Sequence, residues 1–406
     1  MNKNRHIKHF TERTGYFERL KPFINKNLIK AVTGQRRVGK SFLMFQLIDE
    51  IKNQTPDANI IYINKENFEF DNIENYKDLI HYVNDKFSQE KPNYLFVDEI
   101  QDINQFEKAL RHFLTEENID IYCTGSNANM LSGELSTYLS GRYIEIKVYS
   151  LTYLEFLKFH KLKNTKHSLN KYLNFGGLPY LKNLPLKEDI VFEYLQNIFT
   201  TIIYKDVIAR NKIRNTNILE NLVRFLANNV GNIISAKKIS DYLKSQNLKV
   251  SAQIILNYLE HLQSAFLIYK VKRTDITGKK VFEIHEKYYF EDWGLKNSLV
   301  GYTKFNINQV LENVVYIHLK AAGYDIMVGQ TGDKEIDFIC ERDGAKLYVQ
   351  VAYLIPDEKV KEREFGNLLL VKDNFPKIVV SLDEYTVKNY KGILHLNLKD
   401  FLTNIK

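Results

Sequence analysis

The stretch from Leu28 to Phe45, LIKAVTGQRRVGKSFLMF, constrains this chain more than any other. A short apolar run ends in GQRRVGKS, and apolar residues at helical spacing follow, beginning with Leu43 and Met44. This order predicts a buried strand, a glycine-containing loop and a helix, with G-x-x-x-x-G-K-S at the junction. Such a loop turns its backbone N–H groups toward one point at a helix N-terminus, where they bind phosphate groups. The stretch therefore predicts a nucleotide-binding site.

Each residue type in this loop has a physical reason. Gly34 and Gly39 permit backbone angles and a close approach to phosphate that a β-carbon would obstruct. Lys40 can reach the β- and γ-phosphates, and Ser41 can offer its hydroxyl to Mg²⁺. We expect the nucleotide to contact the whole loop and the first helical turn: Gly34, Gln35, Arg36, Arg37, Val38, Gly39, Lys40, Ser41 and Phe42. The alternative is a chance match in a lysine-rich chain, and the flanking strand and helix argue against it.

A second motif, NYLFVDEIQD, spans residues 93–102. Consecutive apolar residues that end in two carboxylates are typical of a buried parallel strand whose carboxyl end opens onto a ligand. We expect Asp98 to bind Mg²⁺ directly or from its second coordination shell, and Glu99 to polarise the water that attacks the γ-phosphate. On their own, two acids at a strand end could simply be solvated. Combined with the phosphate loop, they favour a site for Mg²⁺ and hydrolysis.

Polar residues also follow the strand predicted over residues 119–123. Either Ser126 or Asn127 could orient the attacking water, and Asn127 is the preferred candidate. Arg142 precedes a further strand and has two interpretations of equal weight. It is either an arginine finger for the γ-phosphate of a neighbouring subunit or a surface side chain that begins a strand. The first interpretation requires a homo-oligomer.

Composition limits the classes of protein that fit. A chain of 406 residues with 44% hydrophobic residues is long enough for two or three packed domains and is not disordered throughout. The net charge of +8 is spread along the chain, so it favours a nucleic-acid partner only weakly. The two cysteines, Cys123 and Cys340, lie in apolar runs and form no metal-binding pair. With no apolar signal core and no run long enough for a bilayer, we expect a cytoplasmic protein without membrane contact.

Several segments together carry a family resemblance: GQRRVGKS, LFVDEIQD, TGSNANML, LSGR and FGGLPYL at residues 175–181. They resemble the prokaryotic AAA-type P-loop ATPases of the archaeal-ATPase group, whose typical partner is a C-terminal domain of the restriction-endonuclease-like type. The resemblance implies an α/β core at residues 1–150, with a five-stranded parallel sheet, and a helical lid at residues 151–215 that closes over the nucleotide. It also implies ATP as the ligand, and the lack of an Asn-Lys-x-Asp guanine signature likewise favours ATP over GTP.

Residues 216–299 resemble a winged-helix module, with three helices followed by a strand-turn-strand around Thr277-Gly278. Such a module would contact the phosphates of double-stranded DNA through basic residues of its wing: Lys270, Lys272, Arg273, Lys279 and Lys280. The predicted third helix has few basic residues, with only Lys249 near its start, which weakens the case for contact with a DNA groove. A protein-interaction or spacer role is the alternative.

The last part, residues 300–406, is predicted to begin with a helix over residues 309–322. Strands are expected to follow, including one over Leu368–Lys372. The order of these elements resembles a nuclease core whose metal site combines a helix Glu, a strand Asp and an acid-x-Lys pair on the next strand.

Only part of that nuclease pattern is present. Glu312 and Asp337 match the first two positions, whereas the third position reads Gln350-Val351-Ala352. Mg²⁺ needs carboxylate ligands, and the attacking water needs a lysine or an equivalent group. Glu335 could replace one ligand, but nothing nearby in the sequence replaces the lysine. We therefore expect a restriction-endonuclease-like fold that has lost its cleavage chemistry.

Two functions fit these expectations. In the first, a Mg²⁺-dependent ATPase uses its hydrolysis cycle as a conformational switch, with DNA as a candidate partner. Lys40, Ser41, Asp98 and Glu99 would carry the chemistry, with support from Asn127 and Arg142. In the second, a DNA- or protein-binding regulatory module holds ATP as a structural ligand with little turnover. The intact Glu99 favours the first.

Overall fold

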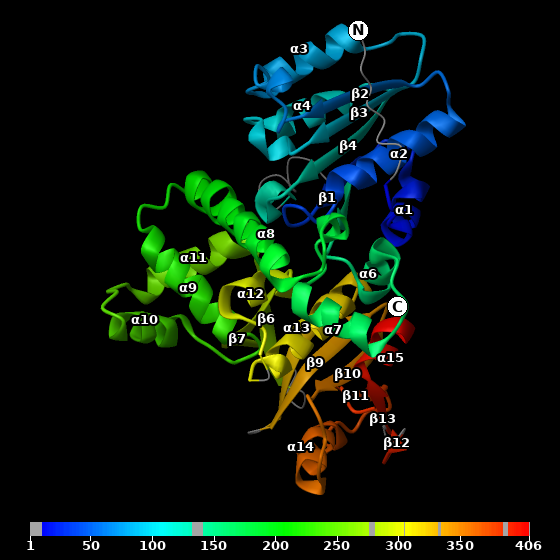
Figure 1. Cartoon of the computed structure of the whole chain (residues 1–406). Helices are drawn as coiled ribbons and strands as arrows, with labels where there is room; N and C mark the ends of the chain where they lie inside the picture. Colours follow the sequence, from blue (N-terminus) through cyan, green and yellow to red (C-terminus); the bar gives the residue numbers. More distant parts are fainter. Residues whose placement is uncertain are drawn as a thin grey trace. The chain divides into compact units, whose positions relative to one another are not determined.

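The computed structural model describes residues 10–131, 141–275, 281–303, 305–331, 334–384 and 389–405. The chain divides into two compact units, Met1–Val148 and Tyr149–Lys406. In the described part of the chain, each unit is built on one β-sheet (Figure 1).

The first unit contains a five-stranded parallel sheet in the order β2-β3-β4-β1-β5. Its strands are β1 (Ile29–Thr33), β2 (Asn59–Asn64), β3 (Asn93–Asp98), β4 (Ile119–Gly125) and β5 (Tyr143–Lys147). Every residue of β1 and β3 is buried, as expected for parallel strands covered on both faces. The predicted five-stranded parallel core is therefore confirmed.

Helices connect these strands and cover the sheet. They are α1 (Thr14–Leu20), α2 (Lys40–Gln54), α3 (Tyr76–Lys86) and α4 (Phe106–Phe113), with short 3-10 helices η1 (Lys21–Phe23), η2 (Phe68–Phe70), η3 (Ile100–Asp102) and η4 (Ala128–Leu131). Apolar side chains of α3 and α4 pack against β3 and β4 in one core that includes Leu79, Leu95 and Phe113. This packing holds the carboxyl ends of β1, β3 and β4 in fixed register, and the candidate site lies at those ends.

The second unit begins with helices. They are α6 (Tyr153–His160), α7 (Lys166–Phe175), η5 (Pro179–Asn183), α8 (Glu188–Thr201), the π-helix η6 (Ile202–Ala209), α9 (Thr216–Asn228), α10 (Ala236–Ser245) and α11 (Ala252–Ser264). The buried helix α12 (Trp293–Val300) packs against α7, α8 and α9. The indole N–H of Trp293 donates to the carbonyl oxygen of Tyr172 at 2.8 Å, which ties α12 to α7.

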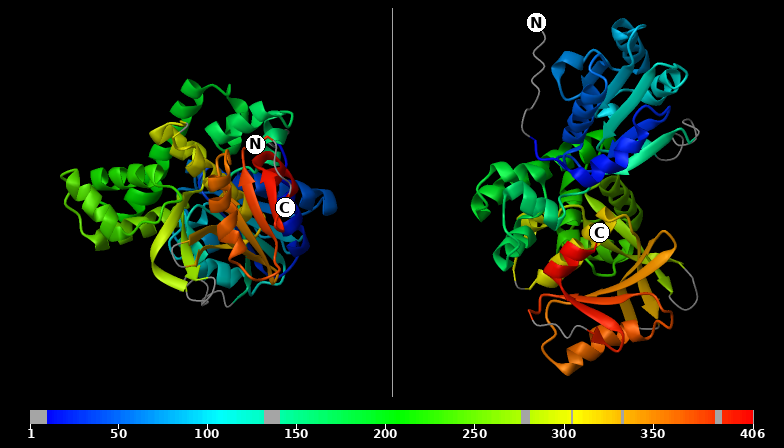
Figure 2. Two further views of the ribbon diagram at one scale, coloured as in Figure 1. Left: turned by 90° about the horizontal axis from the view of Figure 1, so that it is seen from below. Right: turned by 90° about the vertical axis from the view of Figure 1, so that its right-hand side faces the viewer.

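The second sheet has eight strands in the order β12-β13-β11-β10-β9-β8-β6-β7. The C-terminal strands of this sheet are coloured orange to red in Figure 2. The strands are β6 (Ile268–Asp275), β7 (Val281–Phe290), β8 (Asp325–Thr331), β9 (Lys334–Arg342), β10 (Ala345–Val351), β11 (Lys377–Ser381), β12 (Asn389–Tyr390) and β13 (Ile393–Asn397). Three helices accompany this sheet: α13 (Ile307–Ala321), α14 (Glu358–Leu369) and α15 (Leu398–Asn404).

The hairpin expected to form a wing is part of this larger sheet. β6 pairs with β7 on one side and runs parallel to β8 on the other, with Arg273 opposite Val328. Backbone hydrogen bonds along both edges of β6 therefore join the hairpin to the strands of the C-terminal part. Two of the expected wing residues, Lys279 and Lys280, lie outside the described residues, as does the turn at Thr277-Gly278.

The strand predicted over Leu368–Lys372 is wrong. Residues up to Leu369 belong to α14, and the chain beyond is irregular until β11. Phe365 and Leu368 lie one turn apart on this helix and pack into the core beside β9 and β11. A short apolar run fits a buried strand and the inner face of a helix equally well, which explains the error.

Candidate active site

The loop after β1 has the backbone shape that its motif predicts. Gly34 and Gly39 have φ angles of 145° and 99°, and Gly39 directly precedes α2. A β-carbon at Gly34 would lie 2.3 Å from the carbonyl oxygen of Val148, so no larger residue fits without a backbone shift. The loop therefore forms a cradle of backbone groups at the N-terminus of a 15-residue helix, a geometry suited to phosphate.

Lys40, the first residue of α2, is buried, and its side chain folds over the loop. Its Nζ lies 3.0 Å from the carbonyl oxygen of Gly34 and 3.1 Å from that of Gln35. The same nitrogen lies 3.5 Å from a carboxylate oxygen of Glu99. Phosphate oxygens entering the loop would compete with these acceptors for the three protons of the ammonium group. The residue is therefore placed to bind phosphate, as expected.

The remaining loop residues differ in their surroundings. Arg36 is buried and forms an ion pair with Glu66, while Arg37 is exposed and adopts a left-handed conformation. The guanidinium of Arg13 donates to the carbonyl oxygen of Val38 at 2.9 Å, which anchors the loop to the segment before α1. Sequence reasoning missed Arg13, because no local pattern marks a residue 25 positions from its partner.

One polar group of the loop is unsatisfied. The side chain of Gln35 is fully buried, and neither its amide nitrogen nor its amide oxygen has a hydrogen-bond partner in the described part of the chain. A buried amide without partners is costly, so this position favours a polar ligand at the loop. Phe42, at the far end of the motif, is 45% exposed and is available for contact with a ligand.

Asp98 ends β3 and is held from three sides. Thr124 donates a short hydrogen bond to Oδ1, and the hydroxyl of Tyr62 lies 3.1 Å from Oδ2. Ser41 also lies close enough to this carboxylate to favour its ionised form, so the two expected Mg²⁺ ligands are neighbours. Burial raises the pKa of Asp98 above its usual value, although Ser41 and the hydrogen bond from Thr124 oppose that rise. A divalent cation bound here would stabilise the ionised form.

Glu99 occupies a left-handed backbone position, with φ 57° and ψ 50°. Such a conformation is uncommon for a residue other than glycine and is often found at functional sites. Its backbone N–H donates to the hydroxyl of Thr124 at 2.9 Å. The hydroxyl of Thr124 therefore contacts both acids of the motif: it donates to the carboxylate of Asp98 and accepts from the backbone N–H of Glu99.

The carboxylate of Glu99 is surrounded by donors. Ser126 donates to it at 2.7 Å, and the amide of Gln101 donates to the same oxygen. Burial raises the pKa of Glu99, but the charge of Lys40 and the hydrogen bonds from Ser126 and Gln101 outweigh burial and lower it to about 2. Glu99 is therefore ionised at neutral pH and can accept a proton or orient a water molecule.

The two candidates at the end of β4 differ in their contacts. Ser126 contacts Glu99, whereas the side-chain oxygen of Asn127 accepts a hydrogen bond from the backbone N–H of Asn129 at 2.8 Å. The geometry therefore favours Ser126 over Asn127 as the polar partner of Glu99. The contacts of Tyr62 and Thr124 with Asp98 were not predicted from the sequence. Thr124 could have been found, because it lies near the end of β4, the strand beside β3.

Arg142 lies away from the phosphate loop of its own chain. It is exposed, and its carbonyl oxygen accepts a hydrogen bond from Ile29, the first residue of β1. The phosphate loop follows Thr33, the last residue of β1, so β1 separates the two by about 13 Å at 3.3 Å per residue. Arg142 therefore lies at the opposite end of β1 from the phosphate loop.

The residues expected from the nuclease pattern meet in the second unit. Glu312 lies on α13, Glu335 and Asp337 lie on β9, and Gln350 lies on β10. The side-chain oxygen of Gln350 accepts a hydrogen bond from the backbone N–H of Asp337 at 3.3 Å. Ala352 is buried just beyond β10. An unexpected residue, Lys287 of β7, contacts all three carboxylates.

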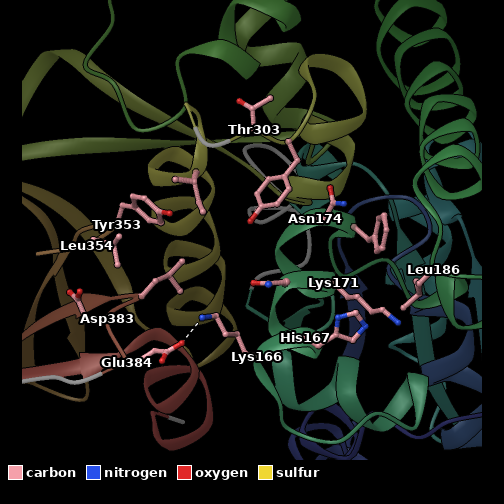
Figure 3. Close-up of a pocket in the computed structure, with 15 residues that line it drawn as sticks. Lys166, His167, Lys171, Asn174, Leu186, Thr303, Tyr353, Leu354, Asp383 and Glu384 are labelled. Atoms are coloured by element: carbon pink, nitrogen blue, oxygen red, sulfur yellow. Dashed lines mark hydrogen bonds and ion pairs between the residues drawn. The ribbon is translucent and has the colours of Figure 1, made fainter. Parts of the chain in front are cut away.

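A separate cavity of about 780 Å³ lies within the second unit (Figure 3). Lys166, His167 and Lys171 of α7 line one side, and Asp383 and Glu384 line the other, with an ion pair between Lys166 and Glu384. Because opposite charges face each other across this cavity, its lining indicates no single class of ligand.

Comparisons with known proteins give the class of the protein. Residues 26–157 match an AAA domain, and residues 166–306 match a domain of unknown function. The Walker-type ATPase paby2304 of Pyrococcus abyssi has a similar fold, with a TM-score of 0.50 and 15% identity, over 72% of this chain and 96% of that chain. The phosphate loop, the paired acids and the match over residues 26–157 define the first unit as a P-loop domain of the AAA type.

Two relatives define the family within this class. An uncharacterized protein of Haemophilus influenzae is 38% identical over 399 residues, which are 96% of this chain and 98% of that protein. Uncharacterized protein MJ1544 of Methanocaldococcus jannaschii is 33% identical, over 83% of this chain and 77% of that protein. The chain belongs to one protein family with these two relatives. Among the described residues, no helix is long and apolar enough to cross a membrane.

Proposed function

We propose that this protein binds ATP together with Mg²⁺ at its phosphate loop and hydrolyses it. One observation carries the proposal: the two acids at the end of β3 face the loop. Asp98 lies close enough to Ser41 for this hydroxyl to favour its ionised form, and Glu99 lies 3.5 Å from the ammonium of Lys40. A loop that only bound a phosphate group would not require two buried acids, because each acid repels an anionic ligand.

The residues of the loop would divide the work of binding. Backbone N–H groups at the start of α2 and the ammonium of Lys40 would hold the phosphates. Ser41 and Asp98 would hold Mg²⁺, which neutralises negative charge on the phosphate oxygens when bound. The contact between these two side chains and the burial of Asp98 support this assignment.

Glu99 would orient and polarise the attacking water. Its pKa of about 2 in the present contacts makes it a weak base. If phosphate oxygens draw Lys40 away, the main charge that lowers the pKa of Glu99 is reduced, and the carboxylate becomes a better proton acceptor. Ser126 and Gln101 would then keep the carboxylate in position.

We further propose that hydrolysis acts as a conformational switch. Binding of the γ-phosphate would order the groups that surround it, and its loss on hydrolysis would release them. Arg142 would supply charge to the γ-phosphate bound by a neighbouring copy, since β1 separates it from the loop of its own chain. This assignment makes the working form a homo-oligomer.

The alternative is a regulatory module that binds a partner and turns over little ATP. One observation favours a protein partner over double-stranded DNA. The exposed face of α11 carries Ile254 and Leu256, which are 41% and 42% exposed, beside the neutral Gln253 and Asn257. Phosphate contact requires basic residues, and this face has none.

A single experiment separates the two functions. Steady-state hydrolysis of ATP is measured for the wild type and for Lys40→Ala, with and without Mg²⁺ and with and without double-stranded DNA. The ATPase proposal predicts Mg²⁺-dependent turnover that Lys40→Ala abolishes. Binding of ATP without turnover under every condition would favour the regulatory module, and stimulation by DNA would restore DNA as the partner.

A further inference from the structure

The second unit contains a buried lysine at the centre of three carboxylates. We call Glu312, Glu335 and Asp337 the acidic cluster. Nζ of Lys287 lies 2.8 Å from Glu312, 2.7 Å from Glu335 and 3.3 Å from Asp337. The lysine side chain is only 2% exposed. None of these four side chains belongs to the nucleotide site.

The ammonium of Lys287 interacts with all three acids. It donates hydrogen bonds to Glu312 and Asp337 and forms an ion pair with Glu335. Burial lowers the pKa of Lys287, but the three carboxylates outweigh burial and raise it above its usual value. The ammonium therefore remains charged across the physiological range of pH.

Further contacts fix the carboxylates in place. The hydroxyl of Tyr289 donates to Glu312 at 2.6 Å, and the backbone N–H of Val351 donates to Asp337 at 2.9 Å. Burial raises the pKa of Glu312, although the charge of Lys287 opposes that rise. Buried acids held this closely need a cation, because removing a partner from a buried charge is strongly destabilising.

A neighbouring turn covers one side of the cluster. Gly231 follows α9 and has a φ of 74°, and a β-carbon there would lie 2.6 Å from a carboxylate oxygen of Glu312. The backbone of this turn therefore packs directly against the acid. Little space is left on that side for a phosphate group of a substrate.

The ammonium of Lys287 occupies the point at which the three carboxylates meet. Carboxylates from a helix and from a strand converge on one point, and oxygen ligands of this kind suit a divalent cation. Yet in the part of the chain that the structure describes, no set of three or more His, Cys, Asp or Glu side chains is arranged to hold a metal ion. The cluster has carboxylates of the kind that bind a metal, and they surround an ammonium instead.

We propose that the ammonium of Lys287 replaces a divalent cation in the acidic cluster, so that this part of the protein folds without metal and does not cleave nucleic acid. The proposal follows from the contacts of Lys287 alone and is independent of ATP hydrolysis. It predicts a gain of function: a small neutral side chain at position 287 frees the three carboxylates and creates a site for a divalent cation.

Titration with Mn²⁺ followed by electron paramagnetic resonance tests this prediction on the full chain without nucleotide. We expect Lys287→Ala to bind one more Mn²⁺ per chain than the wild type, and the double variant Lys287→Ala/Asp337→Asn to lose that site. Mn²⁺ should also raise the melting temperature of Lys287→Ala but not that of the double variant. An unchanged number of Mn²⁺ ions in Lys287→Ala would overturn the proposal.

Lys346→Ala is the matched control. Lys346 forms an exposed ion pair with Glu341 at 2.9 Å in the same sheet, so its loss frees a carboxylate without creating a cluster. We expect no additional Mn²⁺ in this variant, and a gain equal to that of Lys287→Ala would contradict a specific site.

A second comparison does not depend on whether Lys287→Ala folds. The wild type and Asp337→Asn should bind the same number of Mn²⁺ ions, and neither should cleave DNA when Mn²⁺ is added. Loss of one Mn²⁺ in Asp337→Asn, or cleavage by the wild type that this variant abolishes, would show that the cluster holds a metal beside Lys287. Either result would overturn the proposal.

Discussion

The ammonium nitrogen of Lys40 lies 3.5 Å from the carboxylate of Glu99. The cation expected to bind phosphate therefore contacts the acid expected to activate water. Both side chains are more than nine-tenths buried, so their mutual attraction is only weakly screened by solvent. Binding of phosphate and activation of Glu99 are thereby coupled through one contact.

Replacing Lys40 by alanine should weaken ATP binding about tenfold to a hundredfold. The reason is that a charge-assisted hydrogen bond to phosphate is lost and Glu99 is left as an uncompensated buried charge. Equilibrium binding of a fluorescent ATP analogue measures the effect. Lys91→Ala, which removes an exposed lysine of the same unit, should bind like the wild type. Equal affinity in Lys40→Ala would remove this residue from the site.

Replacing Thr124 by valine should lower turnover about tenfold and raise the Mg²⁺ concentration needed for half-maximal activity. The valine keeps the shape of the side chain but removes the hydroxyl that donates to Asp98 and accepts from the backbone N–H of Glu99. Thr124→Ser keeps the hydroxyl and should retain most of the activity. If Thr124→Ser is as impaired as Thr124→Val, packing of the methyl group explains the effect.

Lys296 gives a prediction about stability and pH. It is 1% exposed in α12, and within the described residues its ammonium has one hydrogen-bond partner, the side-chain oxygen of Asn297 at 3.5 Å. Burial lowers its pKa from 10.5 to about 8. The folded protein therefore binds fewer protons than the unfolded chain between these two values, and its stability should rise as the pH increases from about 8 to 10.5.

Lys296→Met should accordingly stabilise the protein at pH 7 by up to ~3 kcal/mol and remove this rise with pH. Urea unfolding at pH 7 and at pH 9.5 measures both effects. Lys359→Met, at an exposed position of α14, serves as the control and should change neither. A less stable Lys296→Met at pH 7 would show that the buried amine has a stabilising partner.

A mixing experiment tests Arg142. Arg142→Ala should lower turnover at least about a hundredfold if this residue completes the site of a neighbouring copy. Glu99→Gln lacks the proposed base but keeps Arg142. A mixture of the two inactive variants should therefore regain activity, because an Arg142→Ala site can be completed by a Glu99→Gln neighbour. A mixture that remains inactive would indicate a structural role for Arg142.

The sequence predicted the parts of the site that depend on neighbouring residues in the chain. The glycine loop, Lys40 and the two acids of β3 are local patterns, and the structure places them together. Tyr62 and Thr124 were not anticipated, because their contact with Asp98 depends on the order of β2, β3 and β4 in the sheet. Sheet order is a non-local property that single residues do not reveal.

The same reasoning explains what was missed in the second unit. Glu312 and Asp337 were recognised from their elements, whereas Lys287 lies 25 residues before the first and 50 before the second. Lys287 lies in the hairpin of β6 and β7, which the sequence analysis assigned to a separate module. Because β6 also pairs with β8, this hairpin belongs to the same sheet as Asp337.

The most direct test of the central claim is to measure ATP binding and ATP hydrolysis on the same samples of wild type, Glu99→Gln and the exposed control Glu117→Gln. We predict that Glu99→Gln binds ATP with an affinity close to that of the wild type but turns it over at least about a hundredfold more slowly. Glu117→Gln should match the wild type in both measurements. Hydrolysis by Glu99→Gln at the rate of the wild type would contradict the assignment of Glu99, and ATP binding by the wild type without hydrolysis would contradict the ATPase itself.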